Sequence, residues 1–140
     1  MKTALRALVI GATVLGGSVV PATAHHSAAM FDATKLVLLR GTVRSFSYMN
    51  PHSWISVDAI ADGKDAAARW DVEATSPTTL ARIGVTEKTL KPGDKVTLGI
   101  RPLRDGRRAG AFVFVVTADG KNYGADPAQL GLKVVELKPS

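Results

Sequence analysis

Hydrophobic and polar residues alternate along most of the chain after residue 35, and this period of two indicates β-strands. Val96, Leu98 and Ile100 show the pattern most clearly, because each is separated from the next by a residue of different character. The segments with this alternation are 36–49, 54–60, 68–74, 95–101 and 109–117. The chain is therefore predicted to be mainly β, with five strands.

The first of these segments is the longest. Its pattern places Val37, Leu39 and Val43 toward a core, and Gly41 within it predicts a bulge or a sharp bend. Pro51 ends the segment because proline cannot donate a hydrogen bond to a strand ladder. Further inward candidates are Leu38 and Phe46.

The period changes between the third and fourth segments. Leu80 and Ile83 lie at helical spacing after Ser76-Pro77, and Gly84 follows as a stop signal, so 78–83 is predicted to be a short helix. Asp-Gly pairs mark the turns that join the other strands.

Three strands, a short helix and two further strands follow one another in the order of an OB-type barrel. We therefore expect a small five-stranded OB-like barrel over 25–123, with one short helix between strands three and four. A plain five-stranded meander is the alternative. Residues 124–140 contain scattered aliphatic residues and are expected to form either an edge strand or a loose tail.

Residues 1–24 have the pattern of an export signal. Lys2 and Arg6 precede an uncharged apolar run over 7–20, and Ala22 and Ala24 fit the small-residue positions of a cleavage site. The run is shorter than the roughly 20 residues that a spanning helix needs. We expect cleavage after Ala24, a periplasmic or secreted protein, and no membrane span after cleavage.

Composition excludes several classes of protein. The chain of 140 residues is 46% hydrophobic and carries a net charge of +6, which is too apolar and too weakly charged for a disordered chain. It has no cysteine, so disulfides, thiolate metal sites and thiol nucleophiles are excluded.

Side chains that bind soft and borderline metals cluster near the predicted mature N-terminus. They are His25, His26, Met30, Met49 and His52. After cleavage, His25 would offer its α-amine and ring Nδ1, and a second histidine would complete three nitrogen donors in the T shape that suits Cu(II). This arrangement resembles the histidine brace of secreted copper proteins. His52 or His26 is the candidate second histidine, and the two methionines are candidates for Cu(I).

Structural roles for the same residues stay open. His25 and His26 can be exposed residues of a frayed terminus, His52 can be a turn residue bonded to the backbone, and Met49 can fill the core.

A basic hairpin offers a second, metal-free interpretation. Arg101, Arg104, Arg107 and Arg108 crowd the turn between strands four and five, a loop that often lines the ligand face of an OB-type barrel. Aromatic residues that can stack beside it are Phe46, Tyr48 and Trp54. The hairpin would bind an anionic ligand or an envelope protein partner; export argues against nucleic acid. A solvated hairpin without a ligand is the simpler alternative.

Enzyme signatures are sparse. The sequence lacks the G-x-S-x-G, H-E-x-x-H, P-loop and G-x-G-x-x-G motifs. Asp71 and Glu73 share a face of the third strand and form a possible carboxylate pair, although acids that face solvent are the commoner case. A binding module is therefore preferred to an enzyme.

Several short motifs together resemble a known family. They are His25-His26-Ser27, Phe31-Asp32, Gly41-Thr42-Val43, 50–55 (NPHSWI), Ser76-Pro77, 90–94 (LKPGD) and Ala118-Asp119-Gly120. The chain resembles, from about residue 25 to 123, the short exported bacterial proteins catalogued as domain of unknown function 6152. The resemblance implies an exported small β-domain, and no activity can be inferred from it.

Overall fold

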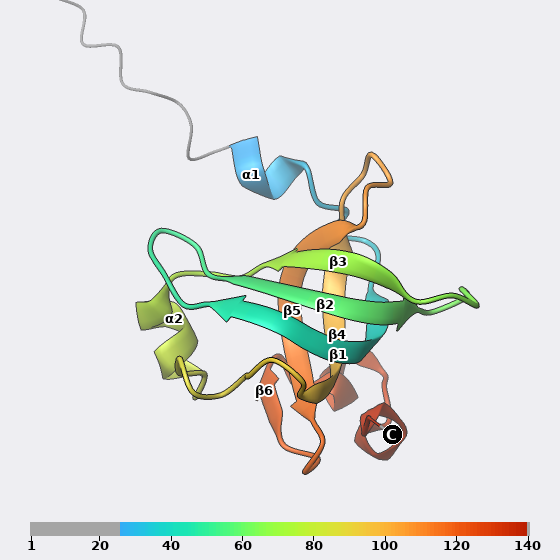
Figure 1. The fold of residues 1–140 in the computed structure, drawn as a ribbon. Coiled ribbons are helices and arrows are strands. Elements are labelled where there is room, and N and C mark those ends of the chain that lie inside the picture. The colour runs from blue at the N-terminus through green and yellow to red at the C-terminus, as the bar shows by residue number, and fades with distance from the viewer. Residues whose placement is uncertain (1–25, 140) are drawn as a thin grey trace, which may run out of the picture.

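The computed structural model describes residues 26–139, and it forms a closed barrel with short helical segments around it (Figure 1). The barrel strands are β1 (Val37–Ser47), β2 (Trp54–Ala61), β3 (Ala68–Glu73), β4 (Lys95–Pro102) and β5 (Ala109–Thr117). The remaining elements are α1 (His26–Ala29), α2 (Pro77–Arg82), β6 (Asn122–Gly124) and the 3-10 helices η1 (Pro127–Leu130) and η2 (Val134–Leu137). Within the described part of the chain, no helix is long and apolar enough to span a membrane.

The strand pairing confirms the predicted OB-like barrel. β1 pairs with both β2 and β4, β2 pairs with β3, and β4 pairs with β5, all antiparallel. A parallel pairing of β3 with β5 closes the barrel. A meander would instead pair β3 with β4, so the alternative topology is excluded.

The interior is filled by the inward residues of the alternating pattern. Leu39, Val43, Val57, Leu98 and Val115 are members of one cluster, and each is at most 1% exposed. α2 closes one end of this barrel. Its N-cap Ser76 accepts a hydrogen bond from the Thr79 amide, and Leu80 packs beneath it.

Three details of the first strand and the helix differ from the predictions. β1 ends at Ser47, and its register shift lies between Val43 and Ser45 rather than at Gly41. Gly41 serves a close approach of β1 to β2, since a Cβ there would lie 2.0 Å from the Asp58 carbonyl oxygen. Ile83 lies one residue beyond α2 and is 39% exposed, so it does not pair with Leu80 in the core.

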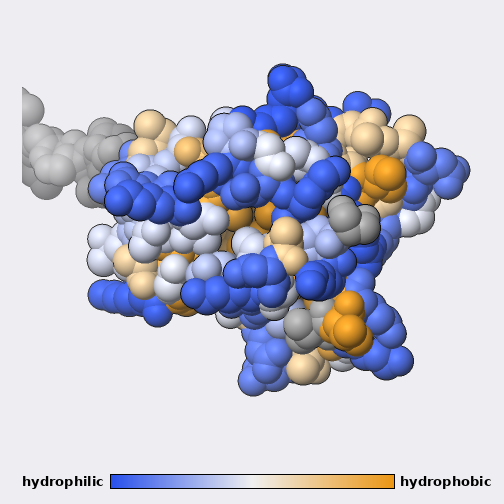
Figure 2. Space-filling model, turned by 60° about the horizontal axis from the view of Figure 1, so that its bottom comes forward, coloured by the Kyte–Doolittle hydropathy of each residue, from blue (hydrophilic) through white to orange (hydrophobic). Residues whose placement is uncertain are grey.

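The C-terminal residues build a second apolar cluster on the outside of the barrel. β6 pairs with β5 and leads into η1 and η2, which bring Leu137 to 2% exposure against Leu38, Phe114 and Val116. Leu38 therefore faces this outer cluster rather than the barrel interior. The face that carries this segment is largely hydrophilic, with apolar atoms in small separate patches (Figure 2).

Candidate functional site

An N-terminal arm, residues 28–35, lies across the end of β4 and the β4–β5 hairpin. The Asp32 amide donates to the Pro102 carbonyl at 2.8 Å, and Phe31 and Leu103 form an isolated bridge. The Arg104 amide donates to the Met30 carbonyl at 2.9 Å. These backbone contacts fix the arm beside the barrel, next to α1 (Figure 1).

The Asp32 carboxylate orders the arm mainly through contacts within the arm itself. It is 8% exposed, and its Oδ1 accepts hydrogen bonds from the hydroxyl and the amide of Thr34. Lys35 lies 3.2 Å from its other oxygen, and Arg104 approaches to 4.0 Å. The Thr34 hydroxyl, followed by the backbone and Lys35 contacts, lowers the pKa of Asp32 to about 2.

The β1–β2 loop is tied to the end of β3. The Ser53 amide donates to the Thr75 carbonyl at 3.1 Å, and the Ala74 amide donates to the Ser53 carbonyl at 2.8 Å. This pairing continues the β2–β3 ladder into the loop and places His52 beside Glu73. His52 Nδ1 contacts Glu73 Oε1, and the two side chains are 43% and 16% exposed.

The arm, the loop and the barrel wall border a shallow, open pocket of about 360 Å³. The arm contributes Ala28, Phe31 and Ala33. The loop and the barrel contribute His52, Glu73, Ala74, Thr75, Arg101, Ala111 and Phe112. The pocket lies on the face where OB-type barrels bind ligands, between the β1–β2 and β4–β5 loops.

The contact with Glu73 determines which ring nitrogen of His52 can bind a ligand. With Glu73 ionised and the ring of His52 neutral, Nδ1 carries the proton and donates to the carboxylate, so Nε2 keeps a free lone pair. Histidines that bind metals are commonly held by a carboxylate in this way. The pair therefore has the chemistry of a metal ligand with its orienting partner.

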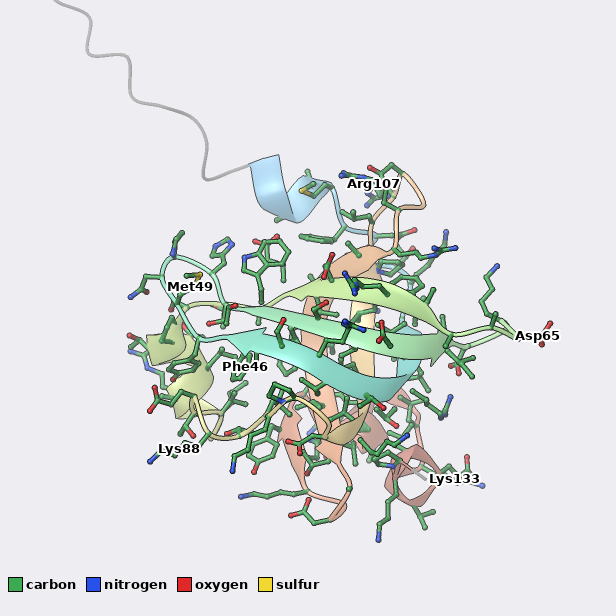
Figure 3. The ribbon with its side chains drawn as sticks, in the orientation of Figure 1. Phe46, Met49, Asp65, Lys88, Arg107 and Lys133 are labelled. Carbon is green, nitrogen blue, oxygen red and sulfur yellow. The ribbon has the colours of Figure 1, made fainter. Side chains whose placement is uncertain are left out.

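Of the predicted metal ligands in the described residues, His52 alone lines this pocket. His25 lies outside the described residues, and α1 begins at His26. Met30 on the arm is 40% exposed, and Met49 on the β1–β2 loop is 53% exposed, so Met49 does not fill the core (Figure 3). Over residues 26–139, no three His, Cys, Asp or Glu side chains converge as a ready metal set.

The arginines of the basic hairpin do not share one ligand surface. Arg104 Nε donates to the Ala29 carbonyl at 3.1 Å, and Arg107, at the hairpin tip in Figure 3, pairs with Asp105. Arg101 lines the 360 Å³ pocket. Arg108 lines a different cavity of about 520 Å³ that also contains Trp70.

Of the aromatic ligand candidates, Trp54 remains accessible. Tyr48 packs edge-on against Phe46 and donates its hydroxyl to the Pro77 carbonyl at 2.8 Å, which attaches α2 to the barrel. Trp54 is 42% exposed and is the register partner of Glu73 across β2 and β3. Its indole therefore lies on the same outer face as the His52–Glu73 pair.

Sequence reasoning did not connect Glu73 with His52, and it did not find the phenylalanines of the pocket. The Asp62-Gly63 turn predicts that β2 and β3 pair as a hairpin. Their exact register, which sets Trp54 opposite Glu73, depends on the length of the turn, and the turn is longer than two residues. Phe31 lies on the arm and Phe112 lies on β5. These two segments come together because the arm folds across the β4–β5 hairpin.

A family model matches residues 13–112 of this chain, and its description is a family of unknown function, DUF6152. The chain belongs to this family. The match begins within the segment predicted as an export signal and ends inside β5, short of Tyr123. No curated protein and no solved structure matches the chain.

Proposed function

We propose that this protein is an exported module that binds Cu(II) through His52 and the histidines at the predicted mature N-terminus. Its family is one of unknown function, so the proposal rests on the chain's own residues. The observation that carries it is the His52–Glu73 pair, in which the carboxylate holds Nδ1 and leaves Nε2 available to a metal.

The position of the arm supports the participation of the terminal histidines. Ala28 lines the same pocket as His52. His25 precedes Ala28 by three residues, and three extended residues span at most about 10 Å. The α-amine and the ring of His25 are therefore within chain reach of the pocket, with His26 as the alternative donor.

The resulting donor set would be three nitrogens: the terminal amine, Nδ1 of the same residue and Nε2 of His52. Such a set suits the tetragonal preference of Cu(II). Met30 precedes the pocket residue Phe31, and Met49 precedes His52 by three residues; neither lines the pocket, and their thioethers would add Cu(I) ligands where the chain brings them to the metal. A role in copper handling at the cell envelope follows from this chemistry.

The metal-free alternative, an anionic ligand on the basic hairpin, has weaker support. Arg104 is bonded to the arm, and Arg107 is bonded to Asp105. A partner that used these guanidinium groups would have to displace both contacts.

The test is a Cu(II) titration with EPR detection on protein that begins at His25. Its control begins with one extra Met before His25, which moves the free amine away from that residue. We expect tight one-to-one binding for the first protein and markedly weaker binding for the second. Equal weak binding by both proteins would reject the proposal.

Glu73→Gln tests the orienting role of the carboxylate. Loss of an outer partner of this kind weakens metal affinity by roughly 10- to 100-fold. Asp71→Asn is the matched control, because Asp71 lies on the same face of β3 but is exposed and outside the pocket. Equal copper affinity of the two variants would remove Glu73 from the site.

A further inference from the structure

Most of the pocket beside His52 is apolar and has no role in the proposed copper site. Phe31 on the arm lines it, Phe112 of β5, which packs against the barrel interior, borders it, and alanines supply the remaining apolar surface. The pocket of about 360 Å³ falls at the small end of the roughly 300–1,000 Å³ typical of sites for small molecules. Its dimensions suit a ligand about the size of one substituted ring.

One cationic side chain, Arg101, lines this pocket. Arg101 pairs with Ala111 across β4 and β5, and Ala111 pairs with Glu73 across β5 and β3. The three residues therefore form one row on the outer surface. Two strand spacings separate Glu73 from Arg101, which is about 10 Å.

The row has a gap in its centre because Ala111 has a small side chain. Arg101 Nη1 donates to the Lys35 carbonyl at 2.7 Å, which holds the guanidinium at the edge of the pocket. A guanidinium has five N–H donors, so further donors remain for a ligand. A planar carboxylate is one of the groups that such a fork binds through two parallel hydrogen bonds, and it is small enough for this pocket.

We propose that this pocket binds a small organic carboxylate with an apolar ring. The carboxylate bonds to Arg101, and the ring lies over Ala111 beside Phe31. The end of the ligand away from Arg101 faces the His52–Glu73 pair. None of the contacts to the carboxylate needs a metal, so the inference is independent of the proposed copper site.

The test is a titration with benzoate of metal-free protein whose chain begins at His25. Backbone amide shifts are monitored by ¹H–¹⁵N NMR. Benzamide is the neutral control with the same ring. We expect benzoate to shift the amides of the pocket, and benzamide to bind at least about tenfold more weakly because it lacks the charge that pairs with Arg101. Equal binding of the two compounds, or no benzoate binding at millimolar concentration, would overturn the proposal.

Two variants locate the binding. Arg101→Gln should abolish the preference for benzoate, whereas Arg108→Gln should keep it, because Arg108 lines the separate 520 Å³ cavity. Ala111→Leu fills the gap in the row without changing charge, and it should exclude the ring. Benzoate binding that survives both Arg101→Gln and Ala111→Leu would place the ligand elsewhere. A copper titration of Ala111→Leu tests the metal site separately from the carboxylate site.

Discussion

Leu137 should contribute to the stability of the whole barrel although it lies two residues from the described C-terminal limit. It is 2% exposed and belongs to the outer cluster with Leu38, Phe114 and Val116. Leu137→Ala would remove buried methyl groups and leave a cavity against β1 and β5. Buried Leu→Ala changes cost about 2–5 kcal/mol. We expect about 2–3 kcal/mol, since a segment near the chain end can partly collapse onto the cavity.

That loss is a large part of the roughly 5–15 kcal/mol that stabilises a typical domain. Urea unfolding followed by tryptophan fluorescence would measure it, because Trp54 and Trp70 both belong to barrel strands. The midpoint should fall while the slope of the free energy against urea stays unchanged. Val135→Ala is the matched control: Val135 is 82% exposed, and its loss should change stability by less than about 0.5 kcal/mol.

Two results would refute this reasoning. Equal midpoints for Leu137→Ala and Val135→Ala would show that the C-terminal segment does not stabilise the barrel. A lower slope with an additional early transition would show that the segment detaches separately, so that the outer cluster and the barrel are not one cooperative unit.

Three shorter predictions concern the strands, the arm and the helix. Gly99→Ala places a Cβ 2.3 Å from the buried ring of Phe114 and should cost about 2 kcal/mol or more in urea unfolding; addition of Phe114→Leu should recover part of that loss, and no recovery would contradict the steric cause. Asp32→Asn removes a carboxylate whose pKa is lowered to about 2, so its contribution to stability is complete above about pH 4 and disappears as the pH falls toward 2. Wild type should therefore exceed Asp32→Asn in stability at pH 7 and converge with it near pH 2, and a constant difference across that range would be inconsistent with stabilisation by the ionised carboxylate. Tyr48→Phe removes the hydrogen bond to the Pro77 carbonyl and should cost about 1 kcal/mol, with faster amide exchange in α2; unchanged exchange there would argue against Tyr48 as the attachment of the helix.

The barrel could be predicted from sequence because its determinants are local. Alternation sets which face of each strand is buried, and Asp-Gly pairs set the turns; Gly63, Gly106 and Gly120 all adopt positive φ there. The position of the helix between strands three and four then selects the OB-type order over a meander. Each of these signals lies within a few residues of the element that it specifies.

The C-terminal architecture is not specified in the same local way. β6 has three residues, too few to display an alternating pattern, and it exists because Tyr123 and its neighbours pair with β5. η2 has only four residues, and the burial of Leu137 depends on the outer faces of β1 and β5. Tertiary packing therefore decides the structure of this segment.

The candidate site also has parts that local sequence signals identify and parts that depend on tertiary packing. His52 and the methionines were identifiable by residue type alone. The partnership of His52 with Glu73 depends on the β2–β3 register and on the backbone pairing of Ser53 with Ala74 and Thr75. The pocket depends further on the arm, whose contacts with the β4–β5 hairpin join residues more than 65 positions apart.

The contacts of the basic hairpin indicate a structural role for Arg104. Its arginines suggested a surface for an anionic ligand, but Arg104 bonds to the arm through its guanidinium and its amide, and it lies near the Asp32 carboxylate. These contacts hold Ala28 and Phe31 over the pocket that contains His52. The same charge that would attract a ligand therefore positions the wall of the proposed site and the chain that continues to the terminal histidines. It follows that loss of the Arg104 side chain should weaken copper binding by loosening the arm, even though Arg104 itself is no ligand.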